Sequence, residues 1–171
     1  PTVSENVVYL SCGGDVQKVS KLYAFDQGTG SKLWEFTAYG QICNSPTISK
    51  GIVYFGSDAG ILYALNAKTG VESWREGIEG SPYASLVVGS EKIFQLTDKA
   101  KLFIMDEATH KKLFVINLGD PATTAASSTP AYYKGVVYAA TLNQKDIGKG
   151  KIYSIDIYSG KILWESLEVG T

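Results

Sequence analysis

Residue types that build reactive or metal-binding sites are scarce in this 171-residue chain. It contains two cysteines, one histidine and one methionine. Cys12 and Cys43 are too few for a disulfide framework, and they leave open either two buried thiols or one bridge. No Cys and His cluster has zinc spacing, and a Ser/His/Asp triad would have to recruit the single His110. The composition therefore gives little support for metal-dependent or nucleophilic chemistry.

The chain also lacks an excess of charge of either sign and any long apolar run. Its 16 Lys and Arg residues balance 17 Asp and Glu residues, so the basic footprint of a nucleic-acid-binding protein is absent. No stretch approaches the roughly 18 apolar residues that a membrane-spanning helix needs. We therefore expect neither a nucleic-acid partner nor a membrane span. Because the chain opens with Pro1 and not Met, we expect a mature product or an excerpt of a longer one.

Glycine and aromatic residues are abundant, and they are arranged in a repeat. The segment Ala24–Trp34 recurs as Ala64–Trp74, more weakly as Ile104–Phe114, and again as Ser154–Trp164. The aromatic residues that close these segments are 40, 40 and 50 positions apart. A period of this size is typical of modular β-architectures in which each repeat packs only against its neighbours.

Each repeat divides into four short strands, named here A to D. In the second repeat we expect strand A at 47–49, B at 52–56, C at 61–66 and D at 72–76. A Lys-Gly pair joins A to B, and turns rich in Gly, Asp and Asn join the others. Strands of this length leave no room for ordinary helices, so the fold class is all-β.

A four-stranded antiparallel unit repeated about every 40 residues is typical of a β-propeller blade. A flat β-solenoid is the alternative, but its repeats are usually shorter and its strands parallel. We expect a single propeller segment, 1–171, with four blades at about 1–38, 45–79, 84–119 and 128–169. An open arc of four blades would expose two apolar lateral faces. The chain is therefore expected to be half of an eight-bladed ring, a four-bladed ring, or one of two halves that associate.

The turn between strands C and D is the most regular part of the repeat. Its glycine is expected where the turn needs a positive φ, and an Asp or Asn four residues earlier is expected to accept backbone hydrogen bonds. The aromatic residue that follows would cover this turn and the edge of the adjacent blade. In the third repeat His110 replaces the glycine, so we expect this repeat to be the least well tied. The expected docking residues are Trp34, Trp74, Phe114, Trp164, Gly30, Gly70 and Gly160.

The pattern Ala-x-Asp/Asn-x-x-Thr-Gly-x-x-x-Trp, together with the preceding stretch Val53–Leu65, resembles the tryptophan-docking repeat of pyrroloquinoline-quinone-type (PQQ-like) propellers. The resemblance spans all four repeats and is strong in the first, second and fourth. It implies a fold that usually closes with eight blades. It does not imply one activity, because the family includes quinone-dependent alcohol dehydrogenases, a non-catalytic lipoprotein of the outer-membrane assembly machine, and secreted or surface proteins.

Differences in length between the repeats fall on one rim of the expected propeller. The B–C hairpins of the first and fourth repeats and the link between the third and fourth repeats are extended, at 11–21, 142–151 and 120–127. Elaborated loops on a rigid scaffold are where binding usually occurs, and tolerated surface insertion is the alternative. The candidate binding residues on this rim are Asp15, Lys18, Lys21, Asp120, Asn143, Gln144, Lys145, Asp146, Lys149 and Lys151.

Two hypotheses of function follow, and a third role, as the sensing domain of a membrane kinase or a chaperone-like outer-membrane assembly factor, cannot be separated from the first by sequence. The favoured one is a non-catalytic module for protein–protein or cell-surface binding or scaffolding. It would lie in the periplasm, outside the cell or on its surface, without a cofactor, and its partner would be another protein or a second propeller half. The alternative is a fragment of a quinone-dependent alcohol dehydrogenase with PQQ and Ca²⁺. That alternative needs adjacent cysteines and a Trp free to stack on the cofactor. Cys12 and Cys43 are 31 positions apart and all three Trp residues are assigned to docking, so no catalytic, cofactor-binding or metal residue is assigned.

Overall fold

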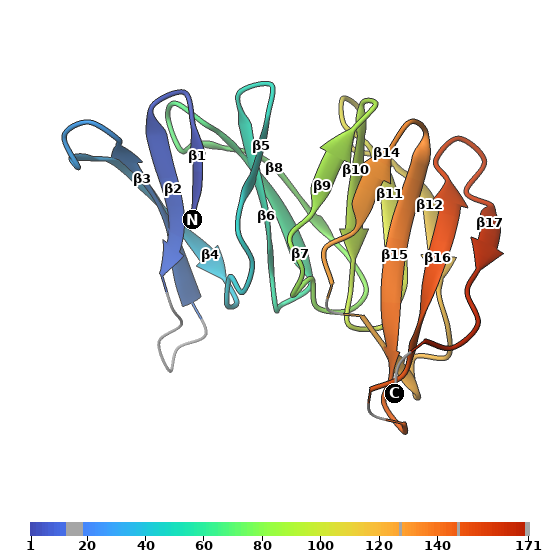
Figure 1. Cartoon of the computed structure of the whole chain (residues 1–171). Helices are drawn as coiled ribbons and strands as arrows, with labels where there is room; N and C mark the ends of the chain where they lie inside the picture. The colour runs from blue at the N-terminus through green and yellow to red at the C-terminus, as the bar shows by residue number, and fades with distance from the viewer. Residues whose placement is uncertain (13–18, 127, 147, 170–171) are drawn as a thin grey trace. The chain divides into compact units, whose positions relative to one another are not determined.

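The computed structural model describes residues 1–12, 19–126, 128–146 and 148–169. These residues form strands and turns and contain no helix, as the turn-rich repeats predicted. Within the same ranges there is consequently no helix with the length and apolar character needed to cross a membrane. The chain divides into two compact units, Pro1–Ser85 and Leu86–Thr171, and each unit holds two antiparallel sheets (Figure 1).

In the first unit, the strands of each sheet are hydrogen-bonded in chain order. The first sheet consists of β1 (Thr2–Ser4), β2 (Val7–Cys12), β3 (Val19–Asp26) and β4 (Lys32–Tyr39). The second sheet consists of β5 (Thr47–Ser49), β6 (Ile52–Ser57), β7 (Ile61–Asn66) and β8 (Glu72–Gly77). The strands expected for the second repeat are therefore confirmed to within one residue at each end.

The second unit repeats this arrangement with one addition. The third sheet consists of β9 (Val87–Gly89), β10 (Lys92–Leu96), β11 (Lys101–Asp106) and β12 (Lys112–Asn117). The fourth sheet contains β14 (Ala131–Tyr133), β15 (Val136–Asn143), β16 (Gly150–Asp156) and β17 (Ile162–Glu165). A fifth strand, β13 (Thr124–Ala125), pairs with the far end of β15. The repeat did not predict β13, because it lies in an insertion that the other repeats lack.

Each unit buries its own apolar core. In the first unit the largest fully buried side chains include Leu22, Phe55 and Leu65. In the second unit Phe94 and Ile104 are fully buried in a separate cluster. Burying one such side chain contributes roughly 1.5–3 kcal/mol. Alternate residues of the inner strands supply these side chains, because successive residues of a strand point to opposite faces of its sheet.

The hairpins between the first two strands of each sheet use left-handed residues at both turn positions. Lys50 and Gly51 have φ angles of 47° and 74°. This two-residue turn has the twist of the strands that it joins, and it favours Gly or Asn because φ is positive twice. Corresponding pairs with positive φ are Glu5–Asn6, Ser90–Glu91 and Lys134–Gly135. The hairpin predicted from Lys50 and Gly51 is therefore confirmed, and its backbone conformation recurs without Gly in two sheets.

The C–D turns are organised by an acidic or amide side chain. Asp26 Oδ1 accepts the backbone N–H groups of Gly28 and Thr29 at 3.1 and 2.7 Å. Asn66 Oδ1 accepts the corresponding N–H groups in the second sheet, at 3.0 Å each. Hydrogen bonds from the Thr29 hydroxyl and backbone hold the pKa of Asp26 below its usual value. The predicted capping role of these side chains is confirmed.

The residue four positions after each capping side chain is left-handed in all four sheets. The φ angle is 70° at Gly30 and Gly70, 68° at Gly160 and 63° at His110. His110 therefore keeps the turn of the third sheet without a glycine, as expected for a residue that tolerates this region better than most.

Candidate functional site: a polar pocket at the end of the fourth sheet

The two sequence insertions of the second unit meet in the structure. β13 belongs to the link after β12, and the end of β15 belongs to the extended hairpin that leads to β16. The two segments pair antiparallel, with Thr124 opposite Asn143. The N–H of Gln144, whose side chain is exposed, donates to the Thr123 carbonyl at 2.9 Å. Two loops that the sequence predicted separately thus form one surface.

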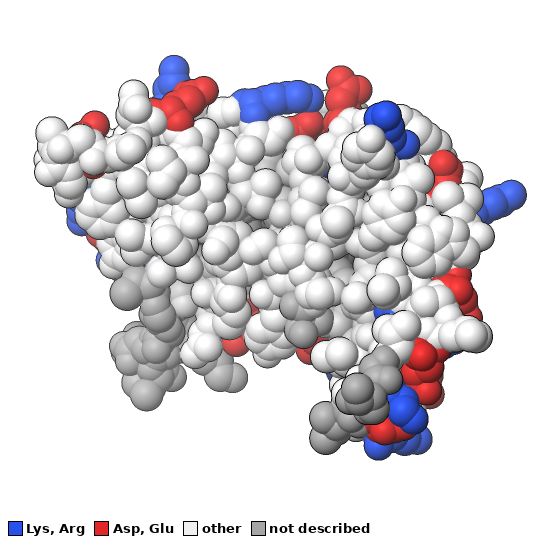
Figure 2. Space-filling model, viewed as in Figure 1, with Lys and Arg blue, Asp and Glu red and all other residues white. Residues whose placement is uncertain are grey.

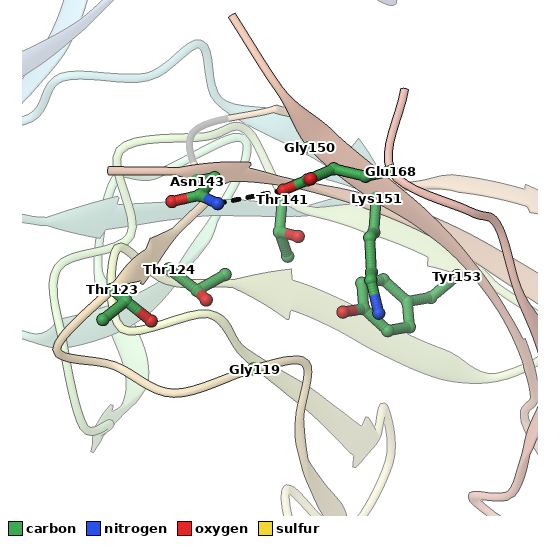
Figure 3. Close-up of a pocket in the computed structure, with 9 residues that line it drawn as sticks. All are labelled: Gly119, Thr123, Thr124, Thr141, Asn143, Gly150, Lys151, Tyr153 and Glu168. Carbon is green, nitrogen blue, oxygen red and sulfur yellow. Dashed lines mark hydrogen bonds between the residues drawn. The ribbon is translucent and has the colours of Figure 1, made fainter. Parts of the chain in front are cut away.

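A pocket of about 180 Å³ lies beside this junction (Figure 3). The side chains of Thr124, Thr141 and Tyr153 point toward the space between them. Thr141 and Tyr153 are buried, with 3% and 5% of their surface exposed. Their hydroxyl groups and that of Thr124 form no hydrogen bond to any residue that the structure describes. The other residues that line the pocket are Gly119, Thr123, Asn143, Gly150, Lys151 and Glu168.

Two glycines shape this pocket. A Cβ at Gly150 would lie 2.0 Å from the backbone oxygen of Thr141, so only glycine lets β15 and β16 approach this closely. Gly119 has a φ of 146°, and a Cβ there would lie 2.7 Å from the Thr124 hydroxyl oxygen. A side chain at either glycine would therefore displace a wall of the pocket.

Asp120 and Asn143, two of the predicted binding residues, organise their own loops. The Asp120 carboxylate accepts the Ala122 N–H at 2.9 Å. Asn143 Oδ1 accepts the N–H of Lys145, an exposed residue, at 3.0 Å. Asn143 Nδ2 donates to Glu168 Oε1 at 2.9 Å across the mouth of the pocket (Figure 3). These side chains hold the backbone in place, and their polar atoms are largely used in doing so.

The charged residues of this rim are mostly paired with one another. Lys149 Nζ lies 2.5 Å from Asp146, and Lys151 Nζ lies 2.9 Å from Glu165. Lys151 Nζ donates this hydrogen bond to the Glu165 carboxylate, which raises the pKa of Lys151. Figure 2 shows acidic and basic side chains side by side at this end of the second unit. The rim therefore presents mixed charge and not a patch of one sign.

The remaining predicted rim residues belong to the first unit. Lys21 Nζ lies 2.5 Å from Glu35, which also pairs with Lys32 at 2.7 Å. Hydrogen bonds from these two ammonium groups lower the pKa of Glu35 to about 2. Asp15 and Lys18 lie outside the described residues. Lys21 is thus a partner in a local ion pair.

A second hollow, of about 320 Å³, lies in the first unit and is lined by Tyr39, Gly40, Asp58 and Ala59. The Asp58 carboxylate already accepts the Gln41 N–H at 2.6 Å. Of the residues that line this hollow only Tyr39 and Asp58 have polar side chains, so the pocket of the fourth sheet, with its three hydroxyl groups, is the better candidate site.

Cys43 is a free, exposed thiol, so both a Cys12–Cys43 bridge and a buried thiol at Cys43 are wrong. The side chain of Cys12 lies outside what the structure describes. Partial burial and the nearby Asp58 carboxylate raise the pKa of Cys43. A raised pKa keeps the thiol protonated and unreactive.

The aromatic residues of the outer strands make a contact that recurs in both units. In the first unit the Trp34 ring lies over Gly70, where a Cβ would be 2.6 Å from the indole. Trp34 Nε1 donates to the Ala67 carbonyl at 3.0 Å. In the second unit the Phe114 ring lies over Gly160 at the same distance, without an N–H to donate.

Sequence reasoning missed the hydroxyl groups that define the pocket. Tyr153 is buried in an inner strand, yet its hydroxyl points toward the pocket. Thr123 and Thr124 stand together in the longest link between repeats, and this was the one available signal. Glu168 reaches the pocket from the segment after β17, a proximity that spacing cannot predict.

Antiparallel sheets of this size and strand order are the blades of a β-propeller. The europium-containing methanol dehydrogenase structure matches with a TM-score of 0.78, over 95% of this chain and 40% of its own, at 13% identity. The BamB structure from Moraxella catarrhalis matches with a TM-score of 0.66, over 94% of this chain and 51% of its own, at 17% identity. At these identities the likeness shows the fold alone.

The chain belongs to the family described as "Outer membrane protein assembly factor BamB", whose sequence pattern matches residues 1–118, and thus to the PQQ-like repeats. It is 25% identical to outer membrane protein assembly factor BamB of Moranella endobia (strain PCIT), over 99% of this chain and 44% of that protein. It is 26% identical to polyvinylalcohol dehydrogenase of a Pseudomonas species, over 78% of this chain and 24% of that protein. The chain spans less than half of the length of these relatives.

Because some relatives are dehydrogenases, we asked whether the described residues could hold a quinone cofactor and a metal ion. Within the described ranges, no three His, Cys, Asp or Glu side chains gather so that they could hold a metal ion. Trp34, Trp74 and Trp164 lie in outer strands, each against a Tyr ring of its own sheet at 5.8–6.1 Å. The described residues therefore do not fit a quinone and Ca²⁺ site.

Proposed function

We propose that this chain is a non-catalytic β-propeller module that binds a segment of another protein at the pocket of the fourth sheet. Three hydroxyl groups, on Thr124, Thr141 and Tyr153, carry this proposal, because they form no hydrogen bond to the part of the chain that the structure describes. A hydroxyl group can both donate and accept, so it matches the N–H and C=O groups of a peptide. Neutral groups are also desolvated at a lower cost than charged ones when a partner covers them.

The size of the pocket limits what enters it. A volume of about 180 Å³ is below the roughly 300–1,000 Å³ of sites that enclose a whole small molecule. One or two side chains of a partner would fill it, and the rest of the interface would rest on the exposed rim around Gln144 and Lys145. The mixed charge of the rim favours a partner without a strong net charge.

The relatives support a protein partner. One of them is named as an assembly factor for outer membrane proteins. By that analogy we assign this chain a binding or scaffolding role and an extracytoplasmic location: periplasmic, secreted or on the cell surface. We also assign residues 1–171 to one propeller segment, half of an eight-bladed ring, whose remaining blades would be its second kind of partner.

A peptide-display selection tests the pocket directly. Peptides selected on the 171-residue chain are measured against a triple variant, Thr124→Val, Thr141→Val and Tyr153→Phe, which keeps the shape and removes the hydroxyls. Losing three hydrogen bonds of about 1 kcal/mol each should weaken binding tenfold or more. Thr97→Val is the matched control, because the Thr97 hydroxyl is buried without a hydrogen-bond partner and lies outside the pocket. It should leave affinity unchanged.

The selection also has outcomes that contradict the proposal. Peptides that bind the triple variant as tightly as the parent would place recognition elsewhere. Selection of no peptide, together with pocket-dependent binding on a glycan array, would assign the pocket to a cell-surface polymer. Stoichiometric retention of PQQ in dialysis with Ca²⁺ would favour the dehydrogenase alternative.

A further inference from the structure

The tyrosine of the pocket has a counterpart in the first unit. Tyr63 in the second sheet directly precedes the residue that lies opposite Trp74 of the outer strand. Tyr153 in the fourth sheet directly precedes the residue that lies opposite Trp164. Both tyrosines are buried, with 1% and 5% of their surface exposed. They therefore hold the same position in their sheets, and the first unit can show what a hydroxyl at this position binds.

In the first unit the tyrosine hydroxyl pairs with the backbone of an extended residue. The Tyr63 hydroxyl accepts the N–H of Tyr39 at 3.1 Å and donates to the carbonyl of the same residue at 3.5 Å. Tyr39 is the last residue of β4, and its own side chain is 63% exposed. The hydroxyl of Tyr63 thus binds the main chain of one residue, while the side chain of that residue stays largely in solvent.

In the second unit the corresponding backbone is not available to the tyrosine. Tyr39 follows Trp34 by five residues, and Gly119 follows Phe114 by five. Gly119 has a φ of 146°, outside the strand conformation, and it begins the long link that contains β13. Gly119 and Tyr153 both line the pocket, and no hydrogen bond joins them in the part of the chain that the structure describes. The pocket therefore lies between two residues whose counterparts are hydrogen-bonded in the first unit.

Resting on the proposed function, we infer that the partner segment bound at this pocket is extended, and that the backbone N–H and C=O groups of one of its residues pair with the Tyr153 hydroxyl as those of Tyr39 pair with Tyr63. The side chain of that residue points to solvent. Because successive side chains of an extended segment point to opposite sides, the residues before and after it supply the side chains that enter the pocket. Recognition of this kind tolerates different side chains at the paired residue and excludes proline, which has no N–H.

The charges at the pocket favour a neutral backbone group over a charged side chain. Two charged residues line the pocket, and each is already paired. Lys151 lies 2.9 Å from the Glu165 carboxylate, and Glu168 accepts a hydrogen bond from Asn143 at 2.9 Å. An acidic or basic side chain entering the pocket would lose its hydration and would have to compete with these pairs. A peptide group carries no charge, and one hydroxyl can satisfy both its donor and its acceptor.

Amide-to-ester scanning of a bound peptide tests the inference. The tightest peptide from the display selection is resynthesised with each backbone N–H replaced in turn by an ester oxygen. At one position the ester should weaken binding to the parent chain roughly fivefold, which corresponds to the loss of one hydrogen bond. The same ester should have no effect on binding to Tyr153→Phe. Alanine at that residue should leave the affinity unchanged, whereas proline should abolish binding.

Tyr63→Phe is the matched control, because it removes the same hydroxyl from the same position of the first unit, where the hydroxyl is used internally. This variant should show the full effect of the ester, and circular dichroism verifies that both variants are folded. A peptide that needs the hydroxyls of the pocket, but has no ester position whose effect depends on Tyr153, would overturn the inference and leave the proposed function standing. Selection of no peptide, or of peptides that bind the triple variant as tightly as the parent, would overturn both.

Discussion

The two units make the same contact between neighbouring sheets with different rings. Trp34 packs over Gly70 and donates its N–H to Ala67, whereas Phe114 packs over Gly160 and has nothing to donate. Both rings approach within 2.6 Å of the position where a Cβ would stand, so both require the absence of a side chain. Packing over a glycine is therefore the common element of the contact. The hydrogen bond is an addition that the first unit has and the second lacks.

Removing the rings should give the largest effects. Trp34→Ala should lower the free energy of unfolding of the first unit by about 3–5 kcal/mol, because it leaves a cavity in the core and removes a hydrogen bond. Phe114→Ala should cost the second unit roughly 2 kcal/mol, because the ring is only half-buried. Urea unfolding combined with hydrogen exchange resolves the two units. Equal losses in both units would contradict the comparison.

Exchanging the rings should isolate the hydrogen bond. Phe114→Trp should raise the free energy of unfolding of the second unit by about 1 kcal/mol, since the new indole N–H can reach the Ile157 carbonyl, the counterpart of Ala67. Trp34→Phe should lower that of the first unit by about the same amount or more. The same denaturant measurements report both changes. A stabilised Trp34→Phe variant would show that the hydrogen bond contributes nothing.

The tight hairpins allow a substitution with a smaller expected effect on stability. Glu91 has a φ of 57°, a conformation strained for any residue with a Cβ. Glu91→Gly should stabilise the second unit by roughly 0.5–1 kcal/mol after the entropy of the unfolded glycine is included. The thermal midpoint measures the gain. Val71→Gly is the control, because Val71 is exposed and does not have a positive φ, and this variant should be destabilised.

Lowering the pH should destabilise the C–D turns of the two units unequally. The change in the free energy of unfolding should be smaller than for the substitutions above. Hydrogen bonds lower the pKa of three turn carboxylates from the usual 3.8: Asp26, Asp106 and Asp156. Because the folded pKa is lowered, each contributes stability that is present above about 3.8 and is lost as pH falls through the lowered value.

The first unit has one such Asp, because Asn66 in its second sheet does not titrate, and the second unit has two. The C–D turns of the second unit should therefore be weakened more than those of the first between pH 4 and pH 2, while Glu35, whose pKa is lowered to about 2, adds a separate loss to the first unit. NMR titration gives the pKa of each turn carboxylate. Acid unfolding of the parent chain and of the Asp156→Asn variant then measures how much stability each unit loses. An Asp156→Asn variant with unchanged acid sensitivity would contradict the assignment.

Much of the fold could be predicted because the determinants are local and repeated. The Gly-containing turns, the capping Asp and Asn residues and the four-strand division follow from spacing, and the structure confirms each of them. β13 could not be predicted, because it forms only when the long link after β12 meets the extended hairpin between β15 and β16 in space. The candidate rim was predicted as three loops, two of which the structure joins.

The chemistry of the candidate site was harder to predict. Asp120 and Asn143 were chosen as polar loop residues, but their side chains cap their own loops. Tyr153 is a buried aromatic residue that also lines the pocket, toward which its hydroxyl points. A tyrosine ring can be buried while its hydroxyl stays accessible. The sequence pattern predicts that the ring is buried, but it does not predict where the hydroxyl lies.

The four sheets could be predicted from the sequence, because their turns and short strands are local features that recur with each repeat. Which polar atoms stay free depends on the folded arrangement. Whether a hydroxyl or carboxylate is used internally depends on neighbours that are distant in the chain, as Glu168 is from Asn143. The fold also decides where an aromatic ring lies over a turn, as over Gly70 and Gly160, because neither the local sequence nor the φ angle of a turn reports what packs against it.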